Sequence, residues 1–143
     1  MSQSNETPGS IAKTLSGEQR AFLAERRFAV MATINPDGSP QQTVVWYELQ
    51  GDEIMLNTAA GRLKDKNLRR DPRISLCVED DYRFVTITGR ARLIDDQAIA
   101  QADIERLAVR YDGAESAKRQ MERFSKQRRV TIRMPIEKIV VYN

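Results

Sequence analysis

The stretch that decides the fold is Phe28-Ala-Val-Met-Ala-Thr-Ile-Asn-Pro-Asp-Gly38, an apolar run that ends in a tight turn. Residues 28–34 are apolar on both faces, which predicts a strand buried on two sides. The last four residues place proline at the second position of a type I turn and glycine where a positive φ follows. The chain therefore predicts a β-hairpin, whose return strand covers about residues 40–49.

Short apolar runs separated by turn residues continue beyond this hairpin. They predict further strands over residues 53–58, 73–79, 82–94 and 129–134, with Pro135 ending the last of these and an edge strand over 139–142. Gly89 suggests a bend of the kind that closes a barrel. Because hairpin connections imply antiparallel pairing, we expect a mainly β fold, a six-stranded antiparallel barrel with peripheral helices.

The helical segments and the tail lie between and before these strands. Ser16-Gly-Glu-Gln19 has the form of a capping box and predicts a short helix after it. Asp95-Asp96 can cap a helix that Asp112-Gly113 breaks into two amphipathic parts. Residues 1 to about 10 are mostly polar and lack periodicity, so we expect a flexible tail over 1–12 followed by one domain over 13–143.

The composition excludes several kinds of chemistry. The 143 residues include no histidine, which removes Ser-His and Cys-His nucleophilic schemes and nearly every zinc site. We therefore expect no metal, identify no catalytic side chain, and expect any enzyme activity to depend on a cofactor. The single cysteine, Cys77, and the lack of a signal peptide or membrane-spanning run predict a cytoplasmic protein without a membrane span.

The segment Ile54–Arg70 predicts a strand that passes through small residues into a basic helix. Backbone N–H groups and the dipole at such a helix start favour an anion, to which Arg62 and Lys64 could add charge. The spacing alone also fits a merely solvated helix start. The later basic residues fit a solvated face, or groups that flank the phosphate or an acidic tail; these are Lys66, Arg69 and Arg70.

Several segments, in order and with matching spacing, resemble the pyridoxamine 5′-phosphate oxidase-like superfamily. They are Ala32-Thr-Ile-Asn-Pro-Asp-Gly-Ser-Pro40, Trp46-Tyr47, Leu56-Asn-Thr58, Gly61-Arg-Leu-Lys64, Asn67-Leu-Arg-Arg-Asp-Pro-Arg73 and Thr88-Gly-Arg-Ala91. The likeness is greatest to the branch of deazaflavin-dependent (coenzyme F-420) reductases. It implies a split β-barrel homodimer with two cofactor sites at the subunit interface. The chain departs from the pyridoxamine-phosphate oxidases themselves because Val-Val-Tyr-Asn143 replaces their Arg/His-containing segment, so we do not expect vitamin B6 oxidation.

The resemblance also implies roles for individual residues. Arg62 and Lys64 match the positions that bind the cofactor phosphate. Three residues match the strand end beside the ribityl chain and ring, namely Asn57, Thr58 and Ala59, and three more match the strand that supports the ring, namely Thr43, Val44 and Val45. Arg129, with Arg128 and residues 82–84, would reach the site of the neighbouring subunit.

The function implied is a deazaflavin-dependent oxidoreductase that transfers a hydride from reduced coenzyme F-420 to an unsaturated small molecule of quinone, enone or tetrapyrrole type. Flavin mononucleotide (FMN) carries a phosphate too, so an FMN-binding oxidoreductase or a non-catalytic flavin- or haem-binding protein remains an alternative. A nucleic-acid-binding barrel is disfavoured, since the net charge is only +3 and aromatic platforms are missing. Trp46 and Tyr47 could stack on a ring, or could pack in the core or at a dimer interface, and Tyr82 or Tyr111 could donate a proton.

Overall fold

The computed structural model of the chain describes residues 11–142, and its side chains over 12–141. These residues form one antiparallel sheet of nine strands in the order β4-β3-β7-β8-β10-β6-β5, with β2 and β9 also paired to β10. The strands are β2 (Ile11–Ala12), β3 (Ala29–Ile34), β4 (Pro40–Val45), β5 (Glu48–Gln50), β6 (Glu53–Ala59), β7 (Arg73–Asp80), β8 (Arg83–Arg90), β9 (Arg92–Ile94) and β10 (Arg129–Tyr142). The helices are α1 (Gly17–Ala24), α2 (Leu63–Arg70) and α3 (Gln97–Phe124).

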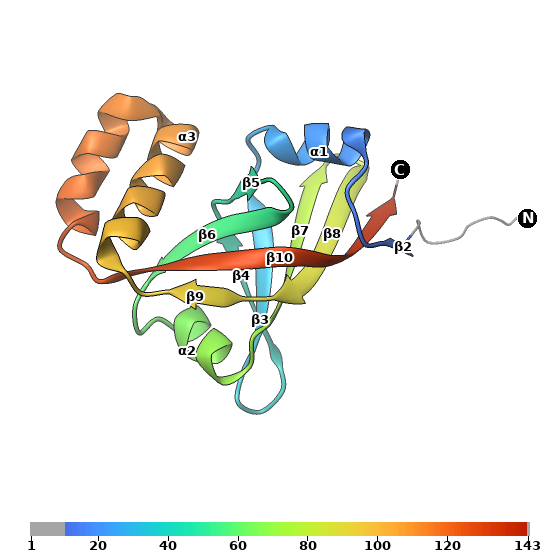
Figure 1. Cartoon of the computed structure of the whole chain (residues 1–143), viewed down its shortest axis with the longest axis horizontal. Coiled ribbons are helices and arrows are strands. Elements are labelled where there is room, and N and C mark those ends of the chain that lie inside the picture. The colour runs from blue at the N-terminus through green and yellow to red at the C-terminus, as the bar shows by residue number, and fades with distance from the viewer. Residues whose placement is uncertain (1–10, 143) are drawn as a thin grey trace, which may run out of the picture.

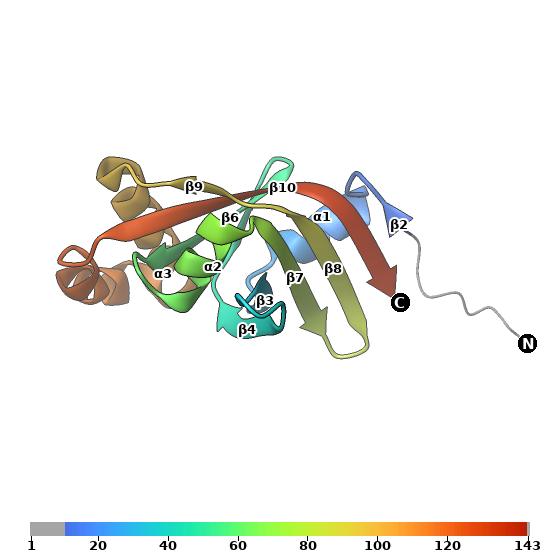
Figure 2. The same ribbon diagram turned by 90° about the horizontal axis from the view of Figure 1, so that it is seen from below.

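The sheet curls around its core, and α3 packs beyond one end of the curl (Figures 1 and 2). The mainly β, split-barrel class is thus confirmed, although nine strands replace the expected six. The count is higher because two predicted strands are each interrupted and because two residues of the expected tail form β2. No helix within residues 11–142 is long and apolar enough to cross a membrane.

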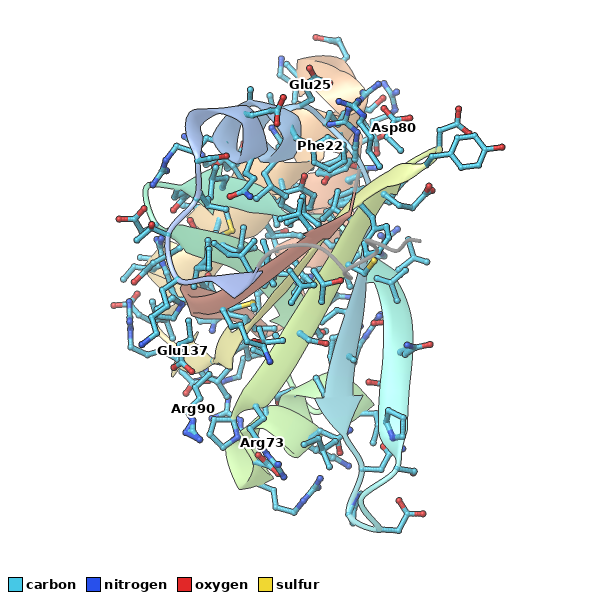
Figure 3. The ribbon with its side chains drawn as sticks, turned by 90° about the vertical axis from the view of Figure 1, so that its right-hand side faces the viewer. Phe22, Glu25, Arg73, Asp80, Arg90 and Glu137 are labelled. Atoms are coloured by element: carbon cyan, nitrogen blue, oxygen red, sulfur yellow. The ribbon has the colours of Figure 1, made fainter. Side chains whose placement is uncertain are left out.

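The β3–β4 hairpin is confirmed. The N–H of Asn35 donates to the carbonyl of Ser39 at 2.8 Å, and Gly38 takes a φ of 88°. The prediction that the first strand is buried on two sides is wrong: Ala29 and Met31 face the core, but Val30 is 38% exposed. The reason is that α3 covers the other face of the sheet mainly over β6 and β10, and leaves that face uncovered at β3 (Figure 3).

The predicted return strand divides at Trp46-Tyr47 into β4 and β5. Tyr47 turns inward at this point, where it is fully buried and its hydroxyl donates to the carbonyl of Leu23 at 2.9 Å. The predicted strand 82–94 divides in the same way at Ala91, whose N–H donates to the carbonyl of Pro72. Both breaks let the chain leave one ladder and enter another.

Strand β10 is the longest strand and connects the two halves of the sheet. The predictions that Pro135 ends a strand and that residues 139–142 form an edge strand are wrong, because β10 runs unbroken over Arg129–Tyr142. Its first half pairs with β6 and β9, and its second half pairs with β8 and β2. Pro135 is tolerated because the register shifts between Ile136 and Lys138, an irregularity that needs fewer ladder N–H donors.

The helices begin and bend where the sequence predicts. Ser16 and Gln19 form both bonds of the capping box before α1, and Asp96 caps α3. α3 bends at Gly113, where φ is 86° and ψ is 164°. The core lies inside the curled sheet and is formed by apolar side chains from α1 and from strands β3, β6, β7, β8 and β10. They include Leu23, Met31, Ile54, Leu76, Ile87 and Ile132.

Candidate anion-binding site

At the junction between β6 and α2, no side chain caps the backbone N–H groups at the start of the helix. Gly61 takes a φ of 87°, and its N–H donates to the buried Asp65 carboxylate at 2.8 Å. Arg62 then occupies the N-cap position with extended φ and ψ and makes no side-chain capping bond. The first turn of α2 therefore keeps backbone N–H groups that an anion can use, with Arg62 and Lys64 beside them.

A cleft of about 230 Å³ lies at this junction, between β4, β6, α2, α3 and the start of β10. Its lining contains most of the predicted site residues: Val44, Val45, Asn57, Thr58, Arg62, Lys64 and Arg129. Two predicted residues do not line it. Ala59 pairs with Arg129 in the β6–β10 ladder, and the Oγ1 atom of Thr43 is buried without a hydrogen-bond partner in the described part of the chain.

Four cationic side chains meet at the cleft and no carboxylate lines it. They are Arg62, Lys64, Arg123 and Arg129, none of which forms an ion pair with any residue of 12–141. Burial, together with the charges of Arg62 and Arg129, lowers the pKa of Lys64. Burial, together with the charges of Arg62 and Arg123, lowers the pKa of Arg129 to about 10. Such unneutralised crowding is relieved when an anion binds.

Arg129 is held by hydrogen bonds to residues of its own chain. Only 5% of the residue is exposed, its Nε donates to Asn57 Oδ1 at 2.9 Å, and its Nη1 donates to Gln127 Oε1 at 2.6 Å. The expectation placed Arg129 at the neighbouring subunit's site. The structure places it beside Lys64, because β10 begins next to the end of β6 (Figure 1).

The sequence did not identify the contribution of α3 to the cleft. Arg123 and Phe124 line it from the end of this helix, and Ile104 and Leu107 line it from the part before the bend. The guanidinium groups of Arg123 and Arg129 lie 4.7 and 4.8 Å from the centre of the Phe124 ring. The one available signal was the density of basic residues over 118–129, which does not reveal which of them turns toward the cleft.

Of the later basic residues of α2, Lys66 is exposed, whereas Arg69 and Arg70 have structural partners. Arg69 bonds to Asp65 and Asp95, with N–O distances of 2.9 and 2.6 Å. Arg70 donates to the carbonyl of Ile34, next to the fully buried Asn67, whose amide donates to side-chain oxygens of the β3–β4 hairpin. These contacts tie α2 to the sheet, so neither arginine is available to flank a phosphate.

Of the aromatic residues Trp46, Tyr82 and Tyr111, only Trp46 lines the cleft. Trp46 lines the cleft and stacks on Tyr111, with ring centres 5.3 Å apart and an angle of 10°. The Tyr111 hydroxyl donates to the carbonyl of Arg27 at 2.6 Å and accepts from the N–H of Tyr47 at 3.1 Å. Tyr82 is 88% exposed in the β7–β8 turn. Neither Tyr82 nor Tyr111 lines the cleft as a proton donor would.

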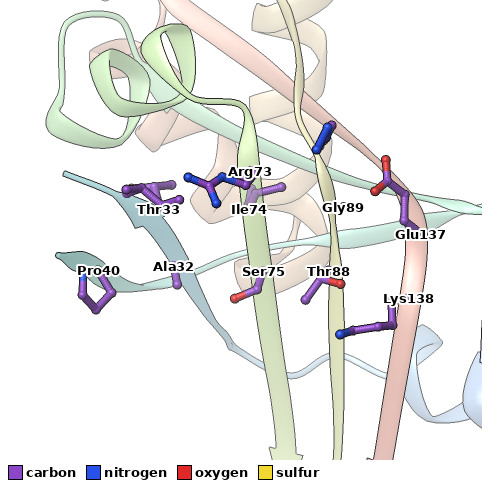
Figure 4. Close-up of a pocket in the computed structure, with 12 residues that line it drawn as sticks. Ala32, Thr33, Pro40, Arg73, Ile74, Ser75, Thr88, Gly89, Glu137 and Lys138 are labelled. Carbon is purple, nitrogen blue, oxygen red and sulfur yellow. The ribbon is translucent and has the colours of Figure 1, made fainter. Parts of the chain in front are cut away.

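A larger hollow of about 410 Å³ lies elsewhere, on the uncovered face of the sheet (Figure 4). Arg73 and Lys138 project over it from β7 and β10, but Glu137 lies beside them, and Ser75 and Thr88 form its floor. This mixed lining is less suited to an anion than the cation-only cleft. Among the described residues no group of three or more His, Cys, Asp or Glu side chains could hold a metal ion.

Comparisons with known proteins show which family and which relatives this chain resembles. A family described as pyridoxamine 5′-phosphate oxidase matches residues 15–140. An F420H(2)-dependent biliverdin reductase of Mycobacterium tuberculosis (strain CDC 1551 / Oshkosh) is 31% identical over 100 residues, which are 68% of this chain and 72% of that protein.

Solved structures give the same fold. The conserved hypothetical protein Rv2991 from Mycobacterium tuberculosis superposes with a TM-score of 0.77 at 29% identity, over 92% of this chain and 88% of that one. A structure described as an F420 reductase has a TM-score of 0.69 at 24% identity, over 84% of this chain and 94% of that one. At 24% identity the second match shows the fold alone.

Proposed function

The chain belongs to the pyridoxamine 5′-phosphate oxidase family, and we propose that it is an oxidoreductase that uses a deazaflavin of the coenzyme F-420 type. The observation that carries the proposal is the cleft in which Arg62, Lys64 and Arg129 meet without any carboxylate. A phosphate group would neutralise this cluster, and the open start of α2 adds N–H donors to it. The F420H(2)-dependent relative supports a deazaflavin over FMN.

The remaining lining fits an elongated ring system next to that phosphate. The apolar lining of the cleft comes from Val44, Val45 and Trp46 at and just after the end of β4, and from Ile104 and Leu107 on α3. These side chains would orient the ring and exclude water from one side, while the cations fix the phosphate end. Bound in its reduced form, the cofactor supplies a hydride to an unsaturated acceptor of quinone, enone or tetrapyrrole type. We assign the accompanying proton to solvent, since neither Tyr82 nor Tyr111 lines the cleft.

We also propose that the protein is a homodimer in which the second subunit completes each cleft. Three apolar residues on or beside the uncovered sheet face remain exposed in one chain: Phe28 by 60%, Val30 by 38% and Val44 by 68%. Val44 belongs both to this face and to the cleft. A second copy that covered the face would bury Val44 and close the open side of the ring pocket.

The direct test is turnover. Purified protein is mixed with reduced coenzyme F-420 and, in turn, with a quinone, an enone and biliverdin, and cofactor oxidation is followed by absorbance. The proposal predicts oxidation with at least one acceptor, and loss of that oxidation when Arg62 and Lys64 are both replaced by Ala. Lys66→Gln is the matched control because Lys66 is an exposed residue of the same helix that does not line the cleft.

Other outcomes would contradict parts of the proposal. Binding and turnover with FMN alone would make the protein an FMN oxidoreductase of the same fold. Tight binding of either cofactor without turnover of any acceptor would make it a non-catalytic flavin-binding protein. Binding of neither cofactor at micromolar concentration would remove the proposed site.

A further inference from the structure

We propose, on the basis of the anion-binding cleft proposed above, that Asn57, Thr131 and Asp103 are positioning residues that fix the Arg129 guanidinium by a one-way chain of hydrogen bonds. Three bonds make up the chain. The Nε–H of Arg129 donates to Asn57 Oδ1 at 2.9 Å, Asn57 Nδ2 donates to Thr131 Oγ1 at 3.3 Å, and the Thr131 hydroxyl donates to Asp103 Oδ2 at 2.7 Å. Each bond is donated in the same direction along the chain, which starts at the cation in the cleft and ends at a carboxylate outside the cleft.

The sheet and α3 bring these residues together. Asn57 on β6 and Thr131 on β10 are direct partners in the ladder, and Arg129 lies two residues before Thr131, on the same face. α3 covers that face and carries Asp103 into it. Thr131 is fully buried, and Asp103 and Arg129 are 9% and 5% exposed, so water has little access to the bonds between them.

Apart from the bond with Thr131, Asp103 has one weaker interaction, the attraction of its charge for Arg106, whose ion pair is with Glu48. Asp103 lies next to Ile104 on the packed face of α3, where an apolar residue would cost less, because burying a carboxylate is unfavourable without compensation. Within residues 12–141 it forms no ion pair, and its side chain accepts one hydrogen bond, from Thr131. A buried negative charge at the end of such a chain makes each acceptor oxygen along it more negative and so strengthens each hydrogen bond. The last of these bonds is to Arg129, so the chain favours the charged, fixed form of its guanidinium.

The chain also changes the role expected for Asn57. Its amide oxygen accepts from Arg129, and its amide nitrogen donates to Thr131 and to the carbonyl of Ala100 at 2.9 Å. With both ends engaged, Asn57 acts on a ligand through Arg129. The Nη1 of Arg129 is held by Gln127, while Nη2 has no partner in the described part of the chain and is left for the ligand.

The test is a double-mutant cycle between Thr131 and Arg129. Thr131→Val keeps the shape and removes the hydroxyl, Thr131→Ser restores it, and Arg129→Gln removes the positioned cation. Affinity is measured for coenzyme F-420 and FMN by fluorescence, and for inorganic phosphate by the rise in Tm. We expect Thr131→Val to weaken binding about tenfold, Thr131→Ser to stay close to the wild type, and Thr131→Val to have no further effect in the Arg129→Gln background.

A purely structural role for Thr131 would give additive losses in the cycle and would overturn the inference. If Thr131→Val does not fold, Asp103→Asn enters the same cycle, since it keeps an acceptor for Thr131 and removes only the charge. Asp103→Asn losses that persist undiminished in the Arg129→Gln background overturn the inference equally. If Arg129→Gln itself leaves all three affinities unchanged, the proposed anion site fails with it; if Arg129→Gln weakens binding and Thr131→Val does not, the positioning chain alone fails.

Discussion

Lys64 and Arg129 show how a binding site can act against the stability of its own fold. Burial and neighbouring positive charges lower the pKa of both groups. A base whose pKa is lower in the folded state opposes folding while it is charged, so its contribution to stability becomes less unfavourable as the pH rises through its folded-state pKa. The cluster therefore lowers the stability of the fold, a cost that the proposed binding of an anion would explain.

Replacement of Lys64 tests this cost. Lys64→Gln should leave the Tm of the ligand-free protein unchanged or raise it by about one to three degrees at pH 7, because repulsion with Arg62 and Arg129 is removed. Thermal unfolding followed by circular dichroism measures the change. Lys66→Gln, outside the cleft, should leave Tm unchanged. A fall of several degrees in Lys64→Gln would show that Lys64 has a structural partner.

The same two groups predict how binding depends on pH. The affinity for inorganic phosphate should be highest near pH 8, where most of the phosphate is the dianion, and should fall as the pH approaches the Arg129 pKa of about 10, since both cations then lose protons. Lys64→Arg should retain more of its affinity at pH 10, because arginine holds its proton more strongly. An affinity that does not change up to pH 10.5 would mean that neither group contacts the anion.

Among the structural elements, β8 and β10 approach each other closely in their antiparallel pair at Gly89. A Cβ atom at Gly89 would lie 2.4 Å from the carbonyl oxygen of Pro135, a backbone atom that cannot move without disrupting β10. Gly89→Ala should lower the free energy of unfolding by about 2–4 kcal/mol in urea denaturation.

Gly17→Ala is the matched control for this substitution. Gly17 begins α1, and a Cβ there would meet no atom within 4 Å. Alanine at Gly17 should therefore be neutral or stabilise by up to about 1 kcal/mol. Equal effects at the two glycines would contradict a role for close strand approach at Gly89.

The elements also show what sequence can and cannot predict. The β3–β4 turn, the capping box at Ser16 and the bend at Gly113 were predicted because each depends on neighbouring residues alone. The continuity of β10 through Pro135 was not, because it depends on which strands lie opposite.

The residues of the candidate site also differ in whether neighbouring or distant parts of the chain determine their role. Arg62 and Lys64 follow from their place at a helix start, which is local information. The involvement of Arg123 depends on how α3 folds back after its bend, and the pairing of Arg69 with Asp95 joins residues 26 positions apart. A charge pattern along the chain cannot tell a cation that has a distant carboxylate partner from one that has none.

For the molecule as a whole, the uncovered sheet face predicts the oligomeric state. The wild-type protein should sediment as a dimer, and Val30→Lys should give a monomer with weakened cofactor binding, because Val30 is exposed on that face. Val109→Lys is the control, since Val109 is 44% exposed on α3, away from the sheet face. A wild-type monomer that binds cofactor as tightly as any assembled form would contradict the proposed interface.

The cation cluster, finally, is tested by fluorescence titration of the wild type and of the Arg62→Ala/Lys64→Ala variant with coenzyme F-420 and, separately, with FMN. The wild type should bind at least one of them, coenzyme F-420 by our proposal, with a micromolar or lower Kd. The variant should bind it about a hundredfold more weakly, because two charge-assisted contacts to the phosphate are lost. Equal affinities for the wild type and the variant, with the variant still folded, would show that the phosphate is not held at the start of α2.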